Sequence, residues 1–207
     1  MRVYTKLTRE YENYLLRLNF GKEISLSGCI ESAYRDFCRT LRGISKLKNK
    51  DELHANAVNH VANAFTELKT RLANATDQAV FDNWHRATCQ ILISVYEGHC
   101  TFSGGQAQKW VNMTLKYVYT VGEEQISGFQ EAYQYCHAPL DNDVIAQLKK
   151  YGFPELTGYW SRIDYDEYFE RQEWIRQRFA PVPPLEVEFW LWLGKDPIDC
   201  AVAAGQM

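Results

Sequence analysis

The sequence lacks the features that mark several common protein classes. Its six cysteines contain no C-x-x-C pair, which argues against a zinc ribbon and against an iron–sulfur cluster loop. Its longest apolar runs, such as Cys89–Tyr96, are far too short to cross a bilayer, and the first residues develop no apolar signal-peptide region. We therefore expect no membrane association, and reduced, buried thiols in the cytoplasm.

The chain also lacks the standard catalytic motifs. It contains no G-x-x-x-x-G-K-[ST] phosphate loop, no G-x-S-x-G elbow and no H-E-x-x-H zinc helix. Its five histidines are dispersed, without carboxylates at metal-ligand spacing. We therefore expect no metal site and no cofactor.

Charge is present but unevenly distributed. The net charge is −3, yet residues 1–50 carry eleven Lys and Arg against five Asp and Glu, whereas the other 157 residues carry twelve against twenty-one. Such a basic segment is typical of a solvated helix end, or of a stripe that follows the phosphates of a nucleic acid. In the second interpretation, Arg35, Arg39 and Arg42 contact the DNA backbone.

Helical periodicity is abundant. Apolar residues recur every three to four positions through most of the chain. This spacing predicts helices over about 27–42, 58–74, 77–98, 106–121, 142–151 and 161–179. Residues 122–138 are polar and predict a long connection with room for a short helix.

Three prolines end the last of these helices and begin a Trp-rich tail, residues 180–207, which we expect to pack back across the body. No repeat or low-complexity linker divides the chain. We therefore predict an all-α fold and a single domain over residues 1–207. Its helices either surround one core or form two lobes that flank a cleft.

Two residues in this pattern suggest chemistry. Lys109 follows a glycine turn and lies beside Trp110 on a largely apolar helix, where burial favours the neutral, nucleophilic amine. Asp141 is at the expected start of another helix, where free amides and the helix dipole favour the carboxylate anion. Such a pair suits attack on a cationic sugar carbon, because the anion stabilises the oxocarbenium-like state and the amine captures C1′ as a Schiff base.

The residues around this pair resemble a known family. The segment Gly105-Gln-Ala-Gln-Lys109-Trp-Val-Asn112 is similar to the G-x-G-x-K-T-A-N hairpin of the helix-hairpin-helix DNA glycosylases. The segment Pro139-Leu-Asp141-Asn-Asp-Val144 is similar to their V-P-V-D-x-x-V segment. From the start of the first segment to the end of the second, the resemblance spans about forty residues of the chain.

The sequence departs from that pattern at the hairpin, since Ala107 replaces its second glycine and Phe102-Ser103 replaces the usual Leu-Pro. In this respect it looks more like the archaeal 8-oxoguanine glycosylase branch and related phage-defence glycosylases. The resemblance implies a hairpin-like element over about 98–121, whose Gly104 and Gly105 would contact the DNA backbone.

The resemblance also implies an activity. The protein would be a monomeric DNA glycosylase with abasic-site lyase activity, acting on double-stranded DNA. It would flip out and excise an oxidised or otherwise modified base, such as 8-oxoguanine or glucosylated hydroxymethylcytosine. Lys109 would be the Schiff-base lysine and Asp141 the essential aspartate.

A base pocket needs aromatic or apolar walls and a few polar groups. The sequence offers these candidates for contact with the base: Trp84, Gln106, Trp110, His137, Trp160, Tyr168 and Gln172. Each of them could instead belong to the core or the surface. A different hypothesis is a non-enzymatic helical interaction module, for which we expect no convergence of Lys109 and Asp141 but a sizeable exposed apolar patch.

Overall fold

The fold is all-α, as the periodicity predicts. The computed structural model describes residues 4–20, 24–72 and 77–203, and in these ranges it contains helices, turns and irregular segments but no strand. None of the helices in the described ranges is long and apolar enough to span a membrane. The α-helices are α1 (Tyr4–Phe20), α2 (Leu26–Phe37), α3 (Lys50–Leu72), α4 (Gln78–Tyr96), α5 (Gly104–Val121), α6 (Asn142–Leu148), α7 (Tyr165–Phe179), α8 (Pro184–Trp192) and α9 (Pro197–Ala203). The 3-10 helices are η1 (Cys38–Thr40), η2 (Ile44–Lys46), η3 (Gln130–Tyr135), η4 (Lys149–Tyr151) and η5 (Trp160–Arg162).

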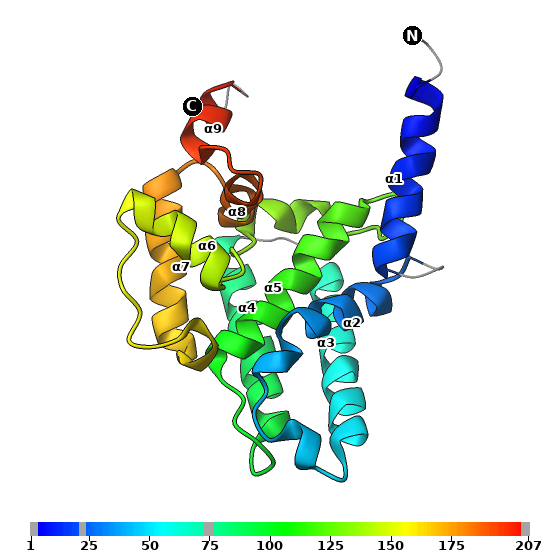
Figure 1. The fold of residues 1–207 in the computed structure, drawn as a ribbon, viewed down its shortest axis with the longest axis vertical. Coiled ribbons are helices and arrows are strands. Elements are labelled where there is room, and N and C mark those ends of the chain that lie inside the picture. The colour runs from blue at the N-terminus through cyan, green and yellow to red at the C-terminus, as the bar shows by residue number, and fades with distance from the viewer. Residues whose placement is uncertain (1–3, 21–23, 73–76, 204–207) are drawn as a thin grey trace.

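Helix α5 lies at the centre of the arrangement (Figure 1), and it contacts α2, α4, α7 and η5. It is buried on nearly all sides from Gly104 to Leu115, so its sequence is apolar or neutral around most of its circumference. Ser103 and Gln106 form a capping box that fixes its first turn, because each side chain accepts a hydrogen bond from the other's backbone amide.

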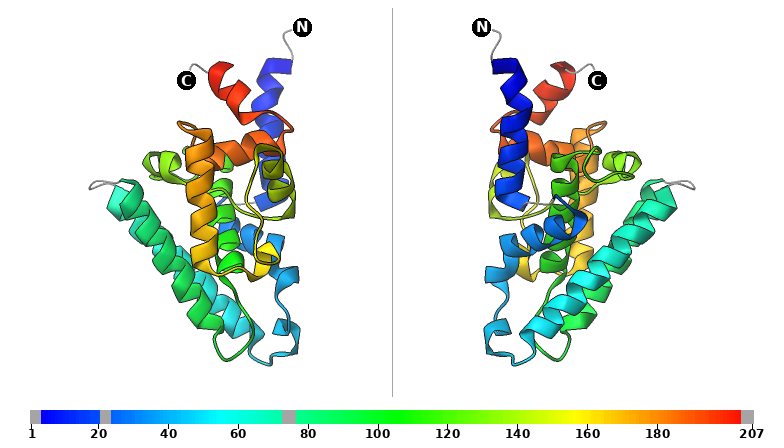
Figure 2. Two further views of the ribbon diagram at one scale, coloured as in Figure 1. Left: turned by 90° about the vertical axis from the view of Figure 1, so that its left-hand side faces the viewer. Right: turned by 90° about the vertical axis from the view of Figure 1, so that its right-hand side faces the viewer.

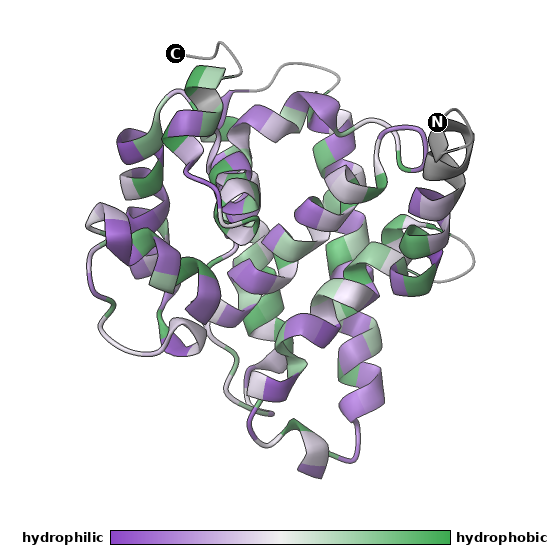
Figure 3. Ribbon diagram, turned by 45° about the horizontal axis from the view of Figure 1, so that its top comes forward, coloured by the Kyte–Doolittle hydropathy of each residue, from purple (hydrophilic) through white to green (hydrophobic). Residues whose placement is uncertain are grey.

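Helices α2, α4 and α7 pack directly on α5, and α3 packs on α2 and α4. Helices α3 and α4 pack side by side and project to one side of the molecule (Figure 2). Apolar and polar residues alternate around the helices (Figure 3), as expected for amphipathic elements around a shared core. The largest side chains without exposed surface in that core include Trp110, Tyr96, Tyr168, Phe37, Phe65 and Phe81.

Several boundaries differ from those that the periodicity predicts. The expected helix at 27–42 ends at Phe37 and continues only as η1, and α3 begins at Lys50, about eight residues earlier than expected. Helix α1 was not predicted from the sequence, and the Pro- and Trp-rich tail contains two further helices, α8 and α9. Pro184 occupies the first turn of α8, where a missing N–H has no cost.

Candidate active site

Lys109 is an almost completely buried charged residue on the central helix. It lies in the second turn of α5, and only 4% of its surface is exposed. A buried ammonium group requires a partner, because transfer of an unpaired charge out of water is costly. Its partner is found on a different segment of the chain.

Asp141 supplies that partner. One carboxylate oxygen, Oδ2, lies 2.5 Å from Lys109 Nζ, and the side chain of Asp141 is 19% exposed. The other oxygen, Oδ1, accepts a hydrogen bond of 2.9 Å from the backbone N–H of Val144, so Asp141 is the N-cap of α6. The structure therefore brings the two predicted residues into contact and fixes the carboxylate by the cap.

The backbone that leads to Asp141 is held by two buried glutamines. The Gln108 side chain donates to the carbonyl of Leu140 at 2.9 Å and accepts from its N–H at 3.2 Å. The Gln172 side chain bonds in the same two-way manner to Ala138, with both distances 2.9 Å. Each glutamine amide thus satisfies both the backbone N–H and the backbone C=O of one residue in this segment. Together the two glutamines fix the position of Asp141 relative to α5.

A second ion pair lies near the first. Lys116 follows Lys109 by seven residues, which places both lysines on one side of α5. Its Nζ lies 2.7 Å from Oε1 of Glu188 on α8. Burial raises the pKa of Glu188, the positive charges of Lys116 and Lys109 oppose that shift, and the negative charge of Asp141 adds to it. The two pairs therefore form one electrostatic group.

Glu188 has an unsatisfied oxygen. The residue is fully buried, and no group in the described part of the chain bonds to its Oε2. A buried oxygen without a partner is costly, and such groups in folded proteins often await a ligand or water. Glu188 therefore provides a free hydrogen-bond acceptor next to the Lys109–Asp141 pair.

An aromatic side chain covers the outer end of this group. The Lys116 ammonium lies 5.2 Å from the ring centroid of Trp192 and the same distance from that of Phe189. Trp192 is 63% exposed and borders a cavity of about 270 Å³ between α6 and α8. The first turn of α6 forms the opposite wall through Asp143 and Val144. This cavity is adjacent to the helix start that Asp141 caps.

Lys116, Glu188 and Trp192 are outside the set that the sequence patterns predict. The seven-residue spacing of Lys109 and Lys116 was the available signal, since it places two cations on one face of an otherwise apolar helix. The sequence did not reveal that the tail contributes Glu188 and Trp192 to this site. A Trp-rich composition is equally typical of a segment that only packs against the core.

The candidates for base contact do not gather around the pair. Trp84 and Trp110 are buried, and their indole N–H groups donate to the carbonyls of Ala64 and Ile30. Trp160 packs against the start of α5, where Gly105 lies against its carbonyl. Gln106 is used in the capping box and also donates to Thr40. The contacts of these four residues are those of residues that hold the fold together.

Two further candidates, His137 and Tyr168, belong to a buried polar network. Asn112 donates to the Tyr168 hydroxyl at 2.7 Å, Tyr168 lies 2.8 Å from His137 Nδ1, and His137 Nε2 lies 2.7 Å from Asp82. Arg176 forms a bidentate pair with Asp82. Burial, and then the charge of Arg176, lower the pKa of His137 to about 4, although Asp82 opposes the shift. The histidine is therefore neutral at physiological pH and joins α7 to the segment before Asp141.

The two glycines at the start of α5 are buried. Added Cβ atoms would overlap the backbone of Tyr165 at Gly104 and the carbonyl oxygen of Trp160 at Gly105. The Gly105 N–H donates to the carbonyl of Ile163 at 3.0 Å. The glycines thus permit close packing of α5 on the 160–165 segment, and a helix-hairpin-helix phosphate site at this turn stays a prediction.

The three arginines predicted to contact the DNA backbone lie in two different places. Arg35 lies on α2 and donates to Ser32 at 2.8 Å. Arg39 and Arg42 instead border a cavity of about 530 Å³ together with Arg162 of η5. The basic segment is therefore not one continuous stripe.

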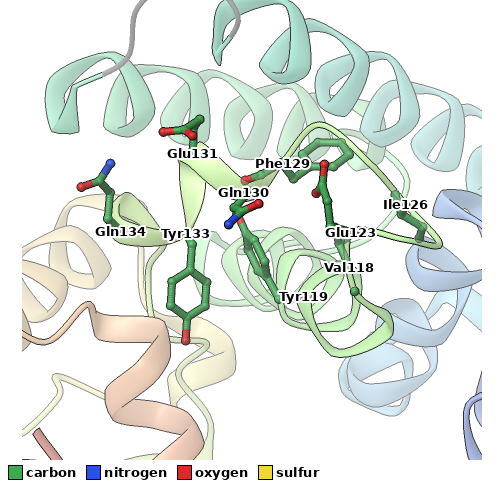
Figure 4. Close-up of a pocket in the computed structure, with 10 residues that line it drawn as sticks. Val118, Tyr119, Glu123, Ile126, Phe129, Gln130, Glu131, Tyr133 and Gln134 are labelled. Atoms are coloured by element: carbon green, nitrogen blue, oxygen red, sulfur yellow. The ribbon is translucent and has the colours of Figure 1, made fainter. Parts of the chain in front are cut away.

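Another cavity, of about 420 Å³, lies at the C-terminal end of α5 (Figure 4). Its lining includes Val118, Tyr119, Glu123, Phe129 and Tyr133. None of the predicted site residues borders it. In the described ranges, no group of three or more His, Cys, Asp or Glu side chains could hold a metal ion.

Comparisons of the chain with protein-family models, with curated proteins and with solved structures found no match.

Proposed function

We propose that the protein is a DNA glycosylase with abasic-site lyase activity, and that Lys109 and Asp141 carry out its chemistry. The observation that supports this proposal most is the contact of a buried amine with a capped carboxylate, 2.5 Å apart. The two residues come from segments 32 positions apart in the sequence, and each segment resembles one of the two glycosylase motifs.

The reaction begins after a modified nucleotide leaves the duplex and enters the site. The Lys109 ammonium donates a proton to the leaving base, and the bond between the base and C1′ breaks with its electron pair passing to the base. Positive charge then develops on the sugar, and the fixed Asp141 carboxylate stabilises it. The Val144 amide keeps this carboxylate in place during the charge change.

The neutral Lys109 amine then forms a bond to C1′. The nitrogen loses a proton to the ring oxygen as the C1′–O4′ bond breaks, which leaves a Schiff base. A proton lost from C2′ to water breaks the C3′–O bond by β-elimination, and the 3′ phosphate departs. Hydrolysis of the Schiff base regenerates the amine.

The second ion pair provides the base pocket in this proposal. The free Glu188 Oε2 can accept a hydrogen bond from an N–H or O–H of the base, and Lys116 can donate to a carbonyl or hydroxyl. Exposed Trp192 offers a planar surface for stacking. Oxidised guanine and glucosylated hydroxymethylcytosine both present such donors and acceptors, so we propose a modified base of this kind as the target.

The proposal is tested by base release from duplexes that contain 8-oxoguanine, glucosylated hydroxymethylcytosine or no modified base. We expect release from at least one modified duplex, and a loss of at least 100-fold in Asp141→Asn, the range for removing one preorganised electrostatic group. Asp51→Asn, at the exposed start of α3, is the control for loss of a carboxylate from the first turn of a helix. Equal release by Asp141→Asn and the unsubstituted protein would refute the role of Asp141.

A specific observation supports a second candidate function, a protein-interaction module. Tyr11, Tyr14, Leu15 and Leu18 of α1 are all more than half exposed. An apolar helix face of this kind is typical of a surface that binds a partner. Light scattering tests whether the partner is a second copy of the chain: we expect a monomer, and a dimer that dissociates in Leu15→Ser/Leu18→Ser would contradict that expectation.

A further inference from the structure

The cavity bordered by Arg39 and Arg42 has an unusual concentration of positive charge. It measures about 530 Å³ and is formed by three separate parts of the chain. Arg39 and Arg42 come from η1 and the residues after it, Ser103 from the connection between α4 and α5, and Tyr159 and Arg162 from the segment around η5. A basic cavity assembled from distant segments is a feature that the sequence alone does not reveal.

The charges in this cavity are not neutralised. Four arginines elsewhere in the described ranges, Arg71, Arg86, Arg171 and Arg176, each form an ion pair with a carboxylate. Within residues 4–20, 24–72 and 77–203, Arg39, Arg42 and Arg162 form no such pair. Three neighbouring cations without carboxylates repel one another, and an anion in the cavity would remove that repulsion.

Two further features of the cavity favour a phosphate of a nucleic acid over a simple anion. Ser103, which borders the cavity, is the N-cap of α5. The positive end of the dipole of this 18-residue helix therefore lies at the cavity wall. Tyr159 is 68% exposed, and its ring centroid lies 5.2 Å from the Arg162 guanidinium. A tyrosine and a guanidinium in this arrangement form a planar surface on which a nucleobase can stack.

The cavity also lies at a useful position relative to Lys109. Ser103 precedes Lys109 by six residues on α5, which corresponds to about 9 Å along the helix axis. Successive phosphates of one DNA strand are spaced by about 3.4 Å along the duplex axis, so this distance corresponds to roughly two to three nucleotides. Figures 1 and 2 place η1, η5 and α6 on the side of α5 that faces away from α3 and α4.

We propose that Arg39, Arg42 and Arg162 bind a backbone phosphate of the DNA strand that carries the target nucleotide. The choice of DNA as the source of the phosphate rests on the proposed function. The cavity then holds the strand a few nucleotides from the flipped position. Such contacts position the strand without reading its sequence.

The test measures binding of an unmodified duplex by fluorescence anisotropy between 50 and 200 mM salt. The variant Arg39→Gln/Arg42→Gln/Arg162→Gln is compared with Arg17→Gln/Arg71→Gln/Arg178→Gln, which removes the same charge from α1, α3 and α7. Each lost phosphate contact lowers the slope of log affinity against log salt by about 0.9, so the fourfold salt change weakens binding about 3.5-fold less per contact. We expect this change in the cavity variant and a smaller one in the control. Circular dichroism confirms that both variants are folded.

The outcomes separate this inference from the proposed function. Equal affinity and salt slope in the cavity variant and the control would overturn the inference, even if the protein releases a modified base. Arginine-dependent duplex binding without base release would support the inference and contradict the proposed activity. A parallel titration uses inorganic phosphate as the probe: arginine-dependent binding of phosphate without binding of duplex would overturn the assignment to DNA.

Discussion

The contact of Lys109 and Asp141 predicts an asymmetric response to substitution. Asp141→Asn keeps an oxygen that can accept from the Val144 amide, so the N-cap of α6 is retained. It removes the negative charge beside the ammonium group of Lys109, a residue that is only 4% exposed. Loss of one partner from a buried ion pair costs about 3–5 kcal/mol. The nearby charge of Glu188 offsets part of this loss, so we expect about 3 kcal/mol.

The opposite substitution is expected to cost less. Lys109→Met leaves Asp141 with a side chain that is 19% exposed, the hydrogen bond from Val144 and the favourable end of the α6 dipole. We therefore expect a loss of about 1 kcal/mol from the lost pairing, since the remaining carboxylate is still solvated and capped. The double variant should resemble Lys109→Met, because no unpaired ammonium remains. The coupling free energy in the cycle should then be about 3 kcal/mol in magnitude.

Urea unfolding followed by tryptophan fluorescence measures this cycle. With a denaturant slope of roughly 2–3 kcal/mol per M, Asp141→Asn should lower the midpoint by about 1 M relative to the unsubstituted protein. The reasoning would be refuted if Asp141→Asn cost less than about 1 kcal/mol, or if the costs of the two single substitutions were additive in the double variant.

Three further predictions follow from other parts of the structure. Gly105→Ala should lower the free energy of unfolding by at least about 2 kcal/mol, because the Cβ of the alanine would overlap the Trp160 carbonyl oxygen. An unchanged melting temperature would contradict this close packing. Glu188→Gln should reduce release of a modified base at least tenfold. It should change borohydride trapping on abasic DNA by no more than about threefold, because an abasic site presents no base to recognise. Equal losses in both assays would argue against a contact between Glu188 and the base. His137, whose pKa is lowered from 6.5 to about 4, stays unprotonated in the folded state, while the unfolded chain takes up a proton below pH 6.5. Through this residue, the free energy of unfolding should therefore fall by about 1.4 kcal/mol for each pH unit as the pH is lowered from 6.5 to 4. If the dependence of the unfolding free energy on pH were the same in His137→Gln, the assignment of this effect to His137 would be contradicted.

Helical periodicity predicted the all-α fold because α2, α3 and α4 each bury one largely apolar face in the shared core. It failed at α1, where the residues that would mark such a face, including Tyr11, Tyr14 and Leu18, are exposed instead of buried. It also gave no helix in the tail, where closely spaced prolines end α7 but one of them begins α8. A proline at the first helical turn and a proline that ends a helix look alike in a single sequence.

The candidate site was only partly predictable for a different reason. Lys109 and Asp141 were recognisable because local motifs surround each of them. The pairing of Lys116 with Glu188 joins residues 72 positions apart, and neither has a local motif. The aromatic residues show the converse problem: composition identifies Trp84, Trp110 and Trp192 equally, but only burial separates the first two, in the core, from the exposed third.

The identity of the lysine that forms a covalent adduct tests the central claim most directly. The protein is reduced with borohydride in the presence of the duplex from which it releases a base, and the adduct is located by tryptic peptide mass mapping. The account predicts a single adduct on Lys109, lost in Lys109→Met and retained in Lys150→Met. An adduct on another lysine such as Lys116, or no adduct in the presence of base release, would contradict the assignment of Lys109 as the nucleophile.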